Sequence, residues 1–236
     1  MNLSLAGQPS RRHESDRQAD HSIPLPAATV VLAGGGSGGH ISPGLAIAER
    51  LIERSARSRA VFACSERAID ADMLRAADAE FFPIPAAPAS LHPRRLVRFL
   101  ARYSRARRTA AEVLRTIDPN HVVALGGFVA APVVGAAVRL GVPVTLVNLD
   151  AQPGRANRWM ARQATRVLSA VETPSAPAFA RRIERIVGMP LRRIALAPAE
   201  PGECRRQLGL DPQRPTLLVT GASQGATSLN RLLLAI

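Results

Sequence analysis

The sequence contains no lysine, only two cysteines and very few aromatic residues, and each scarcity excludes a class of protein. All 31 of its basic residues are arginines, and Phe, Trp and Tyr make up 3% of the 236 residues. Cys64 and Cys204 are too few for a disulfide scaffold and lack the spacing of metal ligands, so we expect buried free thiols. Few aromatic rings leave few platforms for stacking bases, and we therefore expect no nucleic-acid partner.

The sequence also lacks a long apolar run. The longest, residues 128–138, contains Pro132 and Gly135 and is far shorter than the roughly 20 residues that cross a bilayer. Residues 1–28 have no apolar centre of the kind found in signal peptides. We therefore expect a protein that is neither exported nor membrane-spanning. Apolar residues make up 47% and charged residues 21%, which is the composition of a globular protein.

The net charge of +13 is unevenly distributed along the chain. Residues 94–115 carry +7, residues 155–166 carry +4 and residues 181–193 carry +4. Local basicity of this kind indicates a surface or pocket that meets anions. The first stretch has the pattern of a basic amphipathic helix, which fits either a solvated arginine face or contact with anionic lipid headgroups. Its candidate lipid-contacting residues are Arg94, Arg95, Arg98 and Arg102.

Short apolar runs alternate with helical patterns along most of the chain, which predicts an α/β fold with a parallel sheet covered on both faces. The predicted strands are residues 28–33, 59–64, 80–84, 121–125, 143–147 and 216–220. The predicted helices are residues 43–54, 66–77, 91–117, a helix of small residues between the strands 121–125 and 143–147, and a segment from 228. Residues 1–27 are expected to be a disordered extension. Residues 28–188 are expected to form one domain, and residues 189–236 the start of a second, incomplete one.

Two glycine-rich loops follow predicted strands and precede predicted helices. The first, residues 34–39, satisfies the G-x-G-x-x-G pattern, but no acidic residue stands where a dinucleotide-binding domain needs one to hold the ribose. Glycines and a helix N-terminus still suit an anionic or sugar ligand. His40 ends this loop and could act as a general base, or could only pack beside the turn. The second loop, residues 221–225, suggests a cleft shared by two α/β units, although Ser223 alone could be an ordinary helix cap.

Asp70 and Asp72 form an Asp-x-Asp pair, a pattern that binds metal ions in some enzymes. The pair falls in a predicted helix, away from both glycine loops, so we interpret it as part of a solvated helix face. Trp159, between basic residues, is expected to serve packing.

Five motifs together resemble the MurG family of bacterial N-acetylglucosamine transferases. They are Gly34-Gly-Gly-Ser-Gly-Gly-His40-Ile-Ser-Pro-Gly-Leu-Ala-Ile-Ala48, Ala124-Leu-Gly-Gly-Phe128, Asn157-Arg-Trp-Met-Ala161, Val187-Gly-Met-Pro-Leu-Arg192 and Gly221-Ala-Ser-Gln-Gly-Ala-Thr-Ser-Leu-Asn230. The resemblance runs from about residue 29 to the end of the chain, over about two-thirds of the family's usual length. It implies a fold of the GT-B glycosyltransferase type, with two Rossmann-like domains of which the second is truncated here.

The resemblance also implies a reaction, its partners and its site. N-acetylglucosamine would pass from UDP-N-acetylglucosamine to undecaprenyl-diphosphate-linked N-acetylmuramyl-pentapeptide, with inversion and with no metal or other cofactor. The enzyme would lie at the cytoplasmic face of the inner membrane, bound peripherally to its anionic surface. His40 would assist deprotonation of the acceptor. The implied substrate-binding residues are Ser37, Gly38, Gly39, Asp150, Arg192, Ser223, Gln224 and Gly225, with Phe128 on the acceptor side.

The sequence departs from the family pattern at several positions. Asp150 stands where the family usually has an asparagine that contacts the donor sugar, and a carboxylate can accept but not donate a hydrogen bond there. Phe128 replaces a tyrosine, which removes a hydroxyl from the acceptor side. An alternative hypothesis is therefore a non-catalytic remnant or accessory protein that binds the lipid intermediate or the membrane without turning it over.

Overall fold

A computed structural model describes residues 26–36, 38–87, 93–221 and 225–235. The side chains of residues 93–98 lie outside this description, as do Ser37, Ser223, Gln224 and most of the predicted N-terminal extension. The strands are β1 (Thr29–Ala33), β2 (Arg59–Ser65), β3 (Glu80–Ile84), β4 (His121–Ala124), β5 (Val144–Asn148), β6 (Arg166–Ser169) and β7 (Arg185–Ile186). The longer helices are α1 (Gly38–Arg54), α2 (Ala68–Ala76), α3 (Pro93–Ile117) and α4 (Gly127–Arg139), followed by α5 (Arg155–Met160), α6 (Pro177–Ala180), α7 (Pro201–Gln207) and α8 (Thr227–Leu233).

The seven described strands form one parallel sheet in the order β3-β2-β1-β4-β5-β6-β7. The chain winds outward from β1 to β3, crosses the sheet along α3, and winds outward again from β4 to β7. This is the doubly wound order of Rossmann-like domains. The direction of winding changes between β1 and β4, so the loops that follow these two strands diverge and leave room for a ligand.

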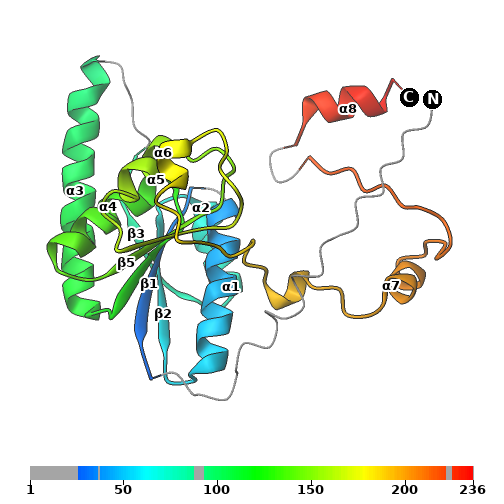
Figure 1. Ribbon diagram of the computed structural model, residues 1–236, viewed down its shortest axis with the longest axis horizontal. Coiled ribbons are helices and arrows are strands. Elements are labelled where there is room, and N and C mark those ends of the chain that lie inside the picture. Colours follow the sequence, from blue (N-terminus) through cyan, green and yellow to red (C-terminus); the bar gives the residue numbers. More distant parts are fainter. Residues whose placement is uncertain (1–25, 37, 88–92, 222–224, 236) are drawn as a thin grey trace.

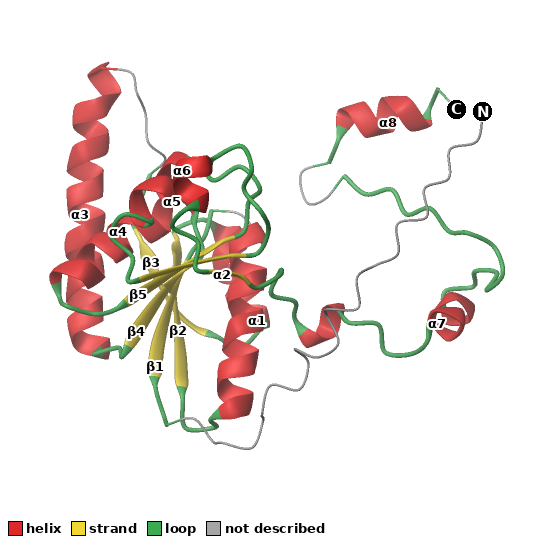
Figure 2. Cartoon of the chain, viewed as in Figure 1, coloured by secondary structure: helices red, strands yellow, loops and turns green. Residues whose placement is uncertain are grey.

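Helices cover the two faces of the sheet (Figures 1 and 2), and a separate hydrophobic core lies under each layer. On one face, α1 and α2 pack against the side chains of Leu32, Phe62 and Leu125. On the other face, α3 and α4 pack against β-branched residues such as Val31 and Val122. Burying one large apolar side chain stabilises a fold by about 1.5–3 kcal/mol, and Leu32 and Phe62 are 0% and 2% exposed.

Residues 28–188 agree with the sequence-based prediction for five strands and four helices, with two differences. The strands β6 and β7 were not predicted, because they are short runs that begin with an arginine. Helix α1 begins at Gly38, five residues before the predicted start at Pro43. Proline is favoured at the first position of a helix, but here it sits in the second turn, so that His40 belongs to the helix and not to the loop.

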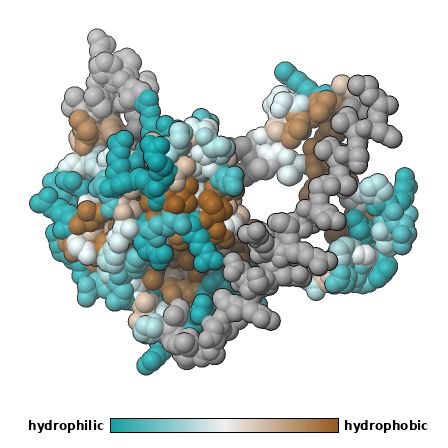
Figure 3. All heavy atoms as spheres, viewed as in Figure 1, coloured by the Kyte–Doolittle hydropathy of each residue, from teal (hydrophilic) through white to brown (hydrophobic). Residues whose placement is uncertain are grey.

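The chain after β7 differs most from the prediction. None of the described residues beyond Phe179 is buried, and α7 and α8 stand away from the sheet (Figure 1). Residues 216–220, predicted as a strand, form no strand in the structure, and Leu217 and Leu218 are 86% and 83% exposed. A strand needs a neighbouring strand for its backbone groups, and none of the described strands pairs with this segment. The predicted helix from residue 228 is confirmed as α8, which carries hydrophobic residues on its surface (Figure 3).

Two further expectations concern the state of the cysteines and the presence of a helix that could cross a bilayer. Cys64 is buried and free, as predicted, whereas Cys204 is free but only half-buried. Burial raises the pKa of the Cys64 thiol to about 11, so this thiol is protonated and unreactive at neutral pH. No described helix combines the length and the apolar character that a bilayer crossing would need.

Candidate functional site

Two glycine segments meet where the winding of the sheet reverses. The first follows β1 and leads into α1, and the second, Gly126 and Gly127, follows β4 and starts α4. A Cβ atom placed on Gly127 would lie 2.8 Å from the carbonyl oxygen of Gly35, so the two backbones are in direct contact. In doubly wound sheets, ligands bind outside the carboxyl ends of the strands at this point.

His40 lies at the centre of this junction. It is the third residue of α1, and its imidazole packs on the second glycine segment: a Cβ atom on Gly126 would lie 3.2 Å from His40 Nε2. The predicted binding residues Gly38 and Gly39 precede it in the first turn of α1. Backbone N–H groups in a first turn have no partner within the helix, and the helix dipole favours anions there. His40 is thus held beside a position suited to a phosphate group.

The electrostatic surroundings of His40 favour its neutral form. Burial lowers the pKa of His40 below its usual value, and the negative charges of Asp150 and Asp70 offset part of this effect. A neutral imidazole at pH 7 can accept a proton, which is what a general base must do.

The histidine pKa values predict how stability depends on pH. Burial lowers the pKa of His121 as well as that of His40, so below about pH 6.5 the unfolded chain binds protons that the native protein does not. The free energy of unfolding should therefore fall as the pH drops from 6.5 toward 5, by at most about 1.4 kcal/mol per pH unit for each histidine. Urea unfolding at pH 7.5 and 5.5 measures this difference. The doubly substituted His40→Gln, His121→Gln chain should lose much of it, and an unchanged slope would contradict the assignment.

An apolar pocket of about 570 Å³ opens beside His40. Its walls come from α3, α4 and α5 and include Phe99, Tyr103, Phe128 and Trp159. Tyr103 contacts Phe99 and Trp159, with ring centroids 6.2 and 6.1 Å apart. Three predicted site residues, His40, Phe128 and Asp150, therefore line one cavity. Trp159 was expected only to pack; it does contact Tyr103, but it is also 37% exposed and lines the pocket.

The interpretation of Asp70 as part of a solvated helix face is wrong. Asp70 is fully buried, and its Oδ2 accepts hydrogen bonds from the backbone N–H of Gly36 at 2.7 Å and of Ser65 at 3.0 Å. Far from lying away from the first glycine loop, it is bonded to it. Asp72 is exposed, as expected, and it forms an ion pair with Arg75. Residues two apart on a helix point in nearly opposite directions, which agrees with Asp70 facing the core and Asp72 facing water.

A buried polar network supports the loop that carries Asp150, and sequence reasoning did not identify it. Asn148, at the end of β5, donates hydrogen bonds to the carbonyl oxygen of Asp150 at 2.7 Å and to Ser169 Oγ at 3.0 Å. Asn157 on α5 donates to Asn148 Oδ1 at 3.0 Å. Because Asn148 and Asn157 are almost fully buried, these bonds fix the loop and the start of α5 relative to His40. The sequence feature that could have indicated this network is Asn148, a polar residue at the end of an apolar run.

The structure does not bring all predicted site residues together. Arg192 lies against Glu49 on α1, with Nε 2.8 Å from Oε1, and it does not line the cavity with His40. Gly225 has a left-handed backbone, with φ of 73°, in the segment away from the sheet. Ser37, Ser223, Gln224 and the side chains of Arg94, Arg95 and Arg98 lie outside the described residues. Arg102 is exposed on α3.

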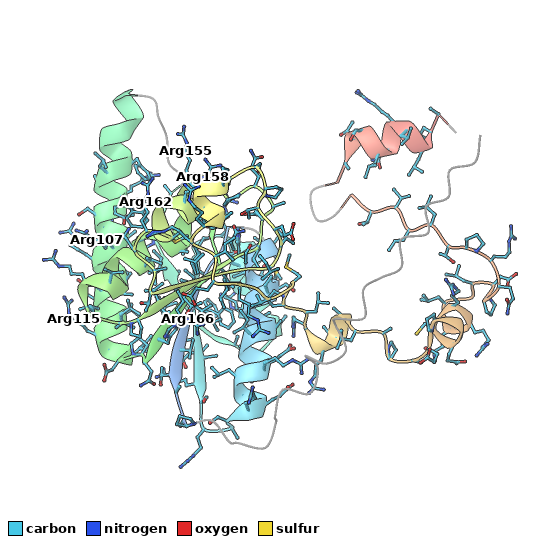
Figure 4. All side chains as sticks on the ribbon, in the orientation of Figure 1. Arg107, Arg115, Arg155, Arg158, Arg162 and Arg166 are labelled. Atoms are coloured by element: carbon cyan, nitrogen blue, oxygen red, sulfur yellow. The ribbon has the colours of Figure 1, made fainter. Side chains whose placement is uncertain are left out.

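Arginines from several elements surround the α3 and α5 side of the domain. Figure 4 shows Arg107 and Arg115 projecting from α3, and Arg155, Arg158 and Arg162 from α5 and the turn after it. The described residues contain no cluster of three side chains suited to holding a metal ion.

A doubly wound parallel sheet, with glycine loops at its switch point and a cavity beside them, defines this part of the chain as a Rossmann-like domain of the GT-B glycosyltransferase type. The chain belongs to glycosyltransferase family 28, because the model of the family's N-terminal domain matches residues 30–169.

Curated relatives agree with this membership. The chain is 38% identical over 209 residues to a protein of Streptomyces coelicolor, and 42% identical over 217 residues to one of Clavibacter michiganensis. Both are named UDP-N-acetylglucosamine–N-acetylmuramyl-(pentapeptide) pyrophosphoryl-undecaprenol N-acetylglucosamine transferase. The matches cover 86% and 87% of this chain and 56% of each relative. The resemblance to the MurG family is thereby confirmed, and the chain spans little more than half the length of these relatives.

Solved structures share the fold. The crystal structure of MurG from Acinetobacter baumannii matches 72% of this chain and 47% of its own, with a TM-score of 0.57 and 23% identity. A UDP-GlcNAc 2-epimerase from Neisseria meningitidis, bound to UDP-GlcNAc, matches 67% of this chain and 45% of its own, with a TM-score of 0.51 and 16% identity. At these identities the likeness concerns the fold alone.

Proposed function

We propose that the complete protein transfers N-acetylglucosamine from UDP-N-acetylglucosamine to undecaprenyl-diphosphate-linked N-acetylmuramyl-pentapeptide in peptidoglycan synthesis. The supporting observation is the position of His40, which lies on the first turn of α1, packs on Gly126 and lines the apolar pocket. Membership of family 28 and the names of the curated relatives point to the same reaction.

In the proposed reaction, the chain's first domain holds the acceptor and activates its hydroxyl group. The acceptor diphosphate would lie at the N-terminus of α1, where the N–H groups of Gly38 and Gly39 can donate to it. Apolar parts of the acceptor would contact Phe128 and the neighbouring pocket residues. His40, neutral at pH 7, would take the proton from the 4-hydroxyl of the muramyl sugar as that oxygen attacks the anomeric carbon of the donor. UDP would leave from the opposite face of the sugar, which gives inversion.

Asp150 would act on this step through charge. It lines the same pocket as His40, and its carboxylate raises the pKa of that histidine. A nearby negative charge stabilises the imidazolium that forms when the proton is taken up. The second half of the site, which would bind UDP and include Arg192, Ser223, Gln224 and Gly225, belongs to the donor domain that we place at residues 189–236 and beyond.

The test is a transfer assay with radiolabelled UDP-N-acetylglucosamine and the lipid acceptor. It compares this chain with a longer form that carries a complete donor domain. We expect transfer by the longer form only. If neither form transfers the sugar but both bind the lipid acceptor, the protein is an accessory binder of the intermediate and the proposed reaction is wrong.

We also propose that the basic end of α3 binds the anionic cytoplasmic face of the inner membrane, which would make the protein peripheral there. Each arginine near such a surface contributes roughly 1 kcal/mol. Changing Arg94, Arg95, Arg98 and Arg102 together to Glu should therefore abolish flotation with vesicles that contain anionic lipid.

The control for that experiment keeps the same change in net charge at another place. It changes four exposed arginines elsewhere to Glu: Arg54, Arg57, Arg75 and Arg206. This control should float nearly as well as the wild type. Equal flotation of both variants would show that the position of the charge is irrelevant and would reject a specific surface on α3.

A further inference from the structure

Asp70 is the buried residue that holds the first glycine loop from beneath. Its Oδ2 accepts three hydrogen bonds, from the N–H groups of Gly36 and Ser65 and from the hydroxyl of Ser65 at 2.5 Å. A Cβ atom on Gly35 would lie 2.5 Å from the same oxygen. The carboxylate therefore fills the space under the loop and ties it to the end of β2.

A second side chain from the segment that contains Asp70, that of Arg67, also binds the first glycine loop. Arg67 Nη1 donates a hydrogen bond to the carbonyl oxygen of Gly36 at 2.6 Å, and its guanidinium lies 5.6 Å from the centre of the Phe128 ring. Both backbone polar groups of Gly36 are thus bound by side chains that are only three residues apart. Gly36 has φ of 87°, a conformation that glycine adopts readily but other residues rarely do. Through Phe128 the arrangement also reaches the wall of the apolar pocket.

Burying the Asp70 carboxylate costs more stability than an apolar side chain that filled the same space would cost. Its Oδ1 is buried and has no hydrogen-bond partner among the described residues, which costs stability. A carboxylate so close to a phosphate-binding turn also repels the ligand. Such costs persist where a particular geometry is required. Since the Gly36 N–H is already bound by Asp70, it is not offered to a ligand, whereas the first turn of α1, which begins at Gly38 and Gly39, has N–H groups without a partner in the helix.

We propose that Asp70 is a positioning residue, which sets the first glycine loop so that the first turn of α1 can receive a diphosphate group. This inference rests on the proposed function for the identity of the ligand. Arg67 and Ser65 assist Asp70, and neither they nor Asp70 touch the ligand.

The test uses inorganic diphosphate as the probe and two readouts. Binding is followed by titration, and the rigidity of the loop by hydrogen exchange at the Gly36 amide. Asp70→Ala should weaken diphosphate binding and speed exchange at Gly36, each about tenfold, because a hydrogen bond to a charged group is lost. Asp70→Asn, which keeps an acceptor oxygen under the loop, should restore binding to within about threefold of the wild type. Asp72→Asn, on the exposed side of α2, should change neither readout.

Ser65→Ala provides a milder variant if Asp70→Ala does not fold. It removes one of the three hydrogen bonds to the carboxylate and should weaken binding about two- to fivefold. Wild-type affinity in both Asp70→Ala and Ser65→Ala would overturn the proposal, as would an Asp70→Asn chain that is no better than Asp70→Ala. If the wild type itself does not bind diphosphate, the ligand assigned by the proposed function is wrong. The exchange rate at Gly36 then still decides whether Asp70 fixes the loop.

Discussion

Replacing His40 with glutamine should reduce sugar transfer by the complete enzyme about 10²- to 10⁴-fold, the usual contribution of a general base. Glutamine preserves much of the size and polarity of the side chain but cannot take up a proton. The loss should appear in kcat more than in KM, because the group acts on the reacting proton and not on the bound lipid. The measurement is the steady-state rate of transfer from UDP-N-acetylglucosamine at saturating acceptor.

A matched control is available in the same sheet. His121 also has a pKa lowered by burial, but it lies on β4 and shares a 2.8 Å hydrogen bond with Thr145 Oγ1, outside the pocket of His40. His121→Gln should leave kcat within about twofold of the wild type. A His40→Gln enzyme with nearly normal kcat and an intact fold would exclude the histidine as the base and leave Asp150 as the candidate.

Replacing Gly127 with alanine should both destabilise the fold and disable the site. Gly127 has φ of 79°, and a Cβ atom there would lie 2.8 Å from the Gly35 carbonyl oxygen. The left-handed backbone costs an alanine about 1–2 kcal/mol, and the collision with rigid backbone adds about 1–3 kcal/mol. The clash would push the two glycine segments apart and displace His40, whose ring contacts Gly127. Chemical denaturation and the transfer assay measure the two effects.

Gly141 separates the two causes. It has φ of 75°, but a Cβ atom there would meet nothing within 4 Å. Gly141→Ala should therefore show only the cost of the left-handed backbone and keep full activity. If the two alanine variants lose the same free energy of unfolding, the close contact between the glycine segments is not a constraint on the native structure.

The order of elements in the first domain could be predicted because each depends on a local pattern. Runs such as residues 28–33 and 121–125 are apolar on both sides, which is the mark of a buried parallel strand. The long basic pattern near residues 91–117 likewise gave α3. The weak strands β6 and β7 have no such pattern of their own, and they pair only because β5 already offers an edge.

Local pattern failed where a polar side chain contacts a residue distant in sequence. Asp70 and Gly36 are 34 positions apart, and nothing near Asp70 in the sequence marks it as the partner of a glycine loop. Asn148 and Asn157 form their hydrogen bond only because β5 and α5 are adjacent in the fold. The pocket residues Tyr103 and Trp159 are 56 positions apart, and the sequence predicted no more than packing for Trp159.

The sequence by itself determined the class of fold, the family and the catalytic candidate, since strand and helix periods and the glycine motif around His40 are properties of neighbouring residues. Only the tertiary structure decided what surrounds that histidine. In the structure, His40 lies in α1 and not in the preceding loop, and it lines one cavity together with Asp150 and Phe128. Arg192 lies outside this cavity and pairs with Glu49. The reason is physical. Burial, pKa and hydrogen bonding depend on atoms that the fold brings together, and the number of residues between two side chains does not reveal how close they lie in the folded protein.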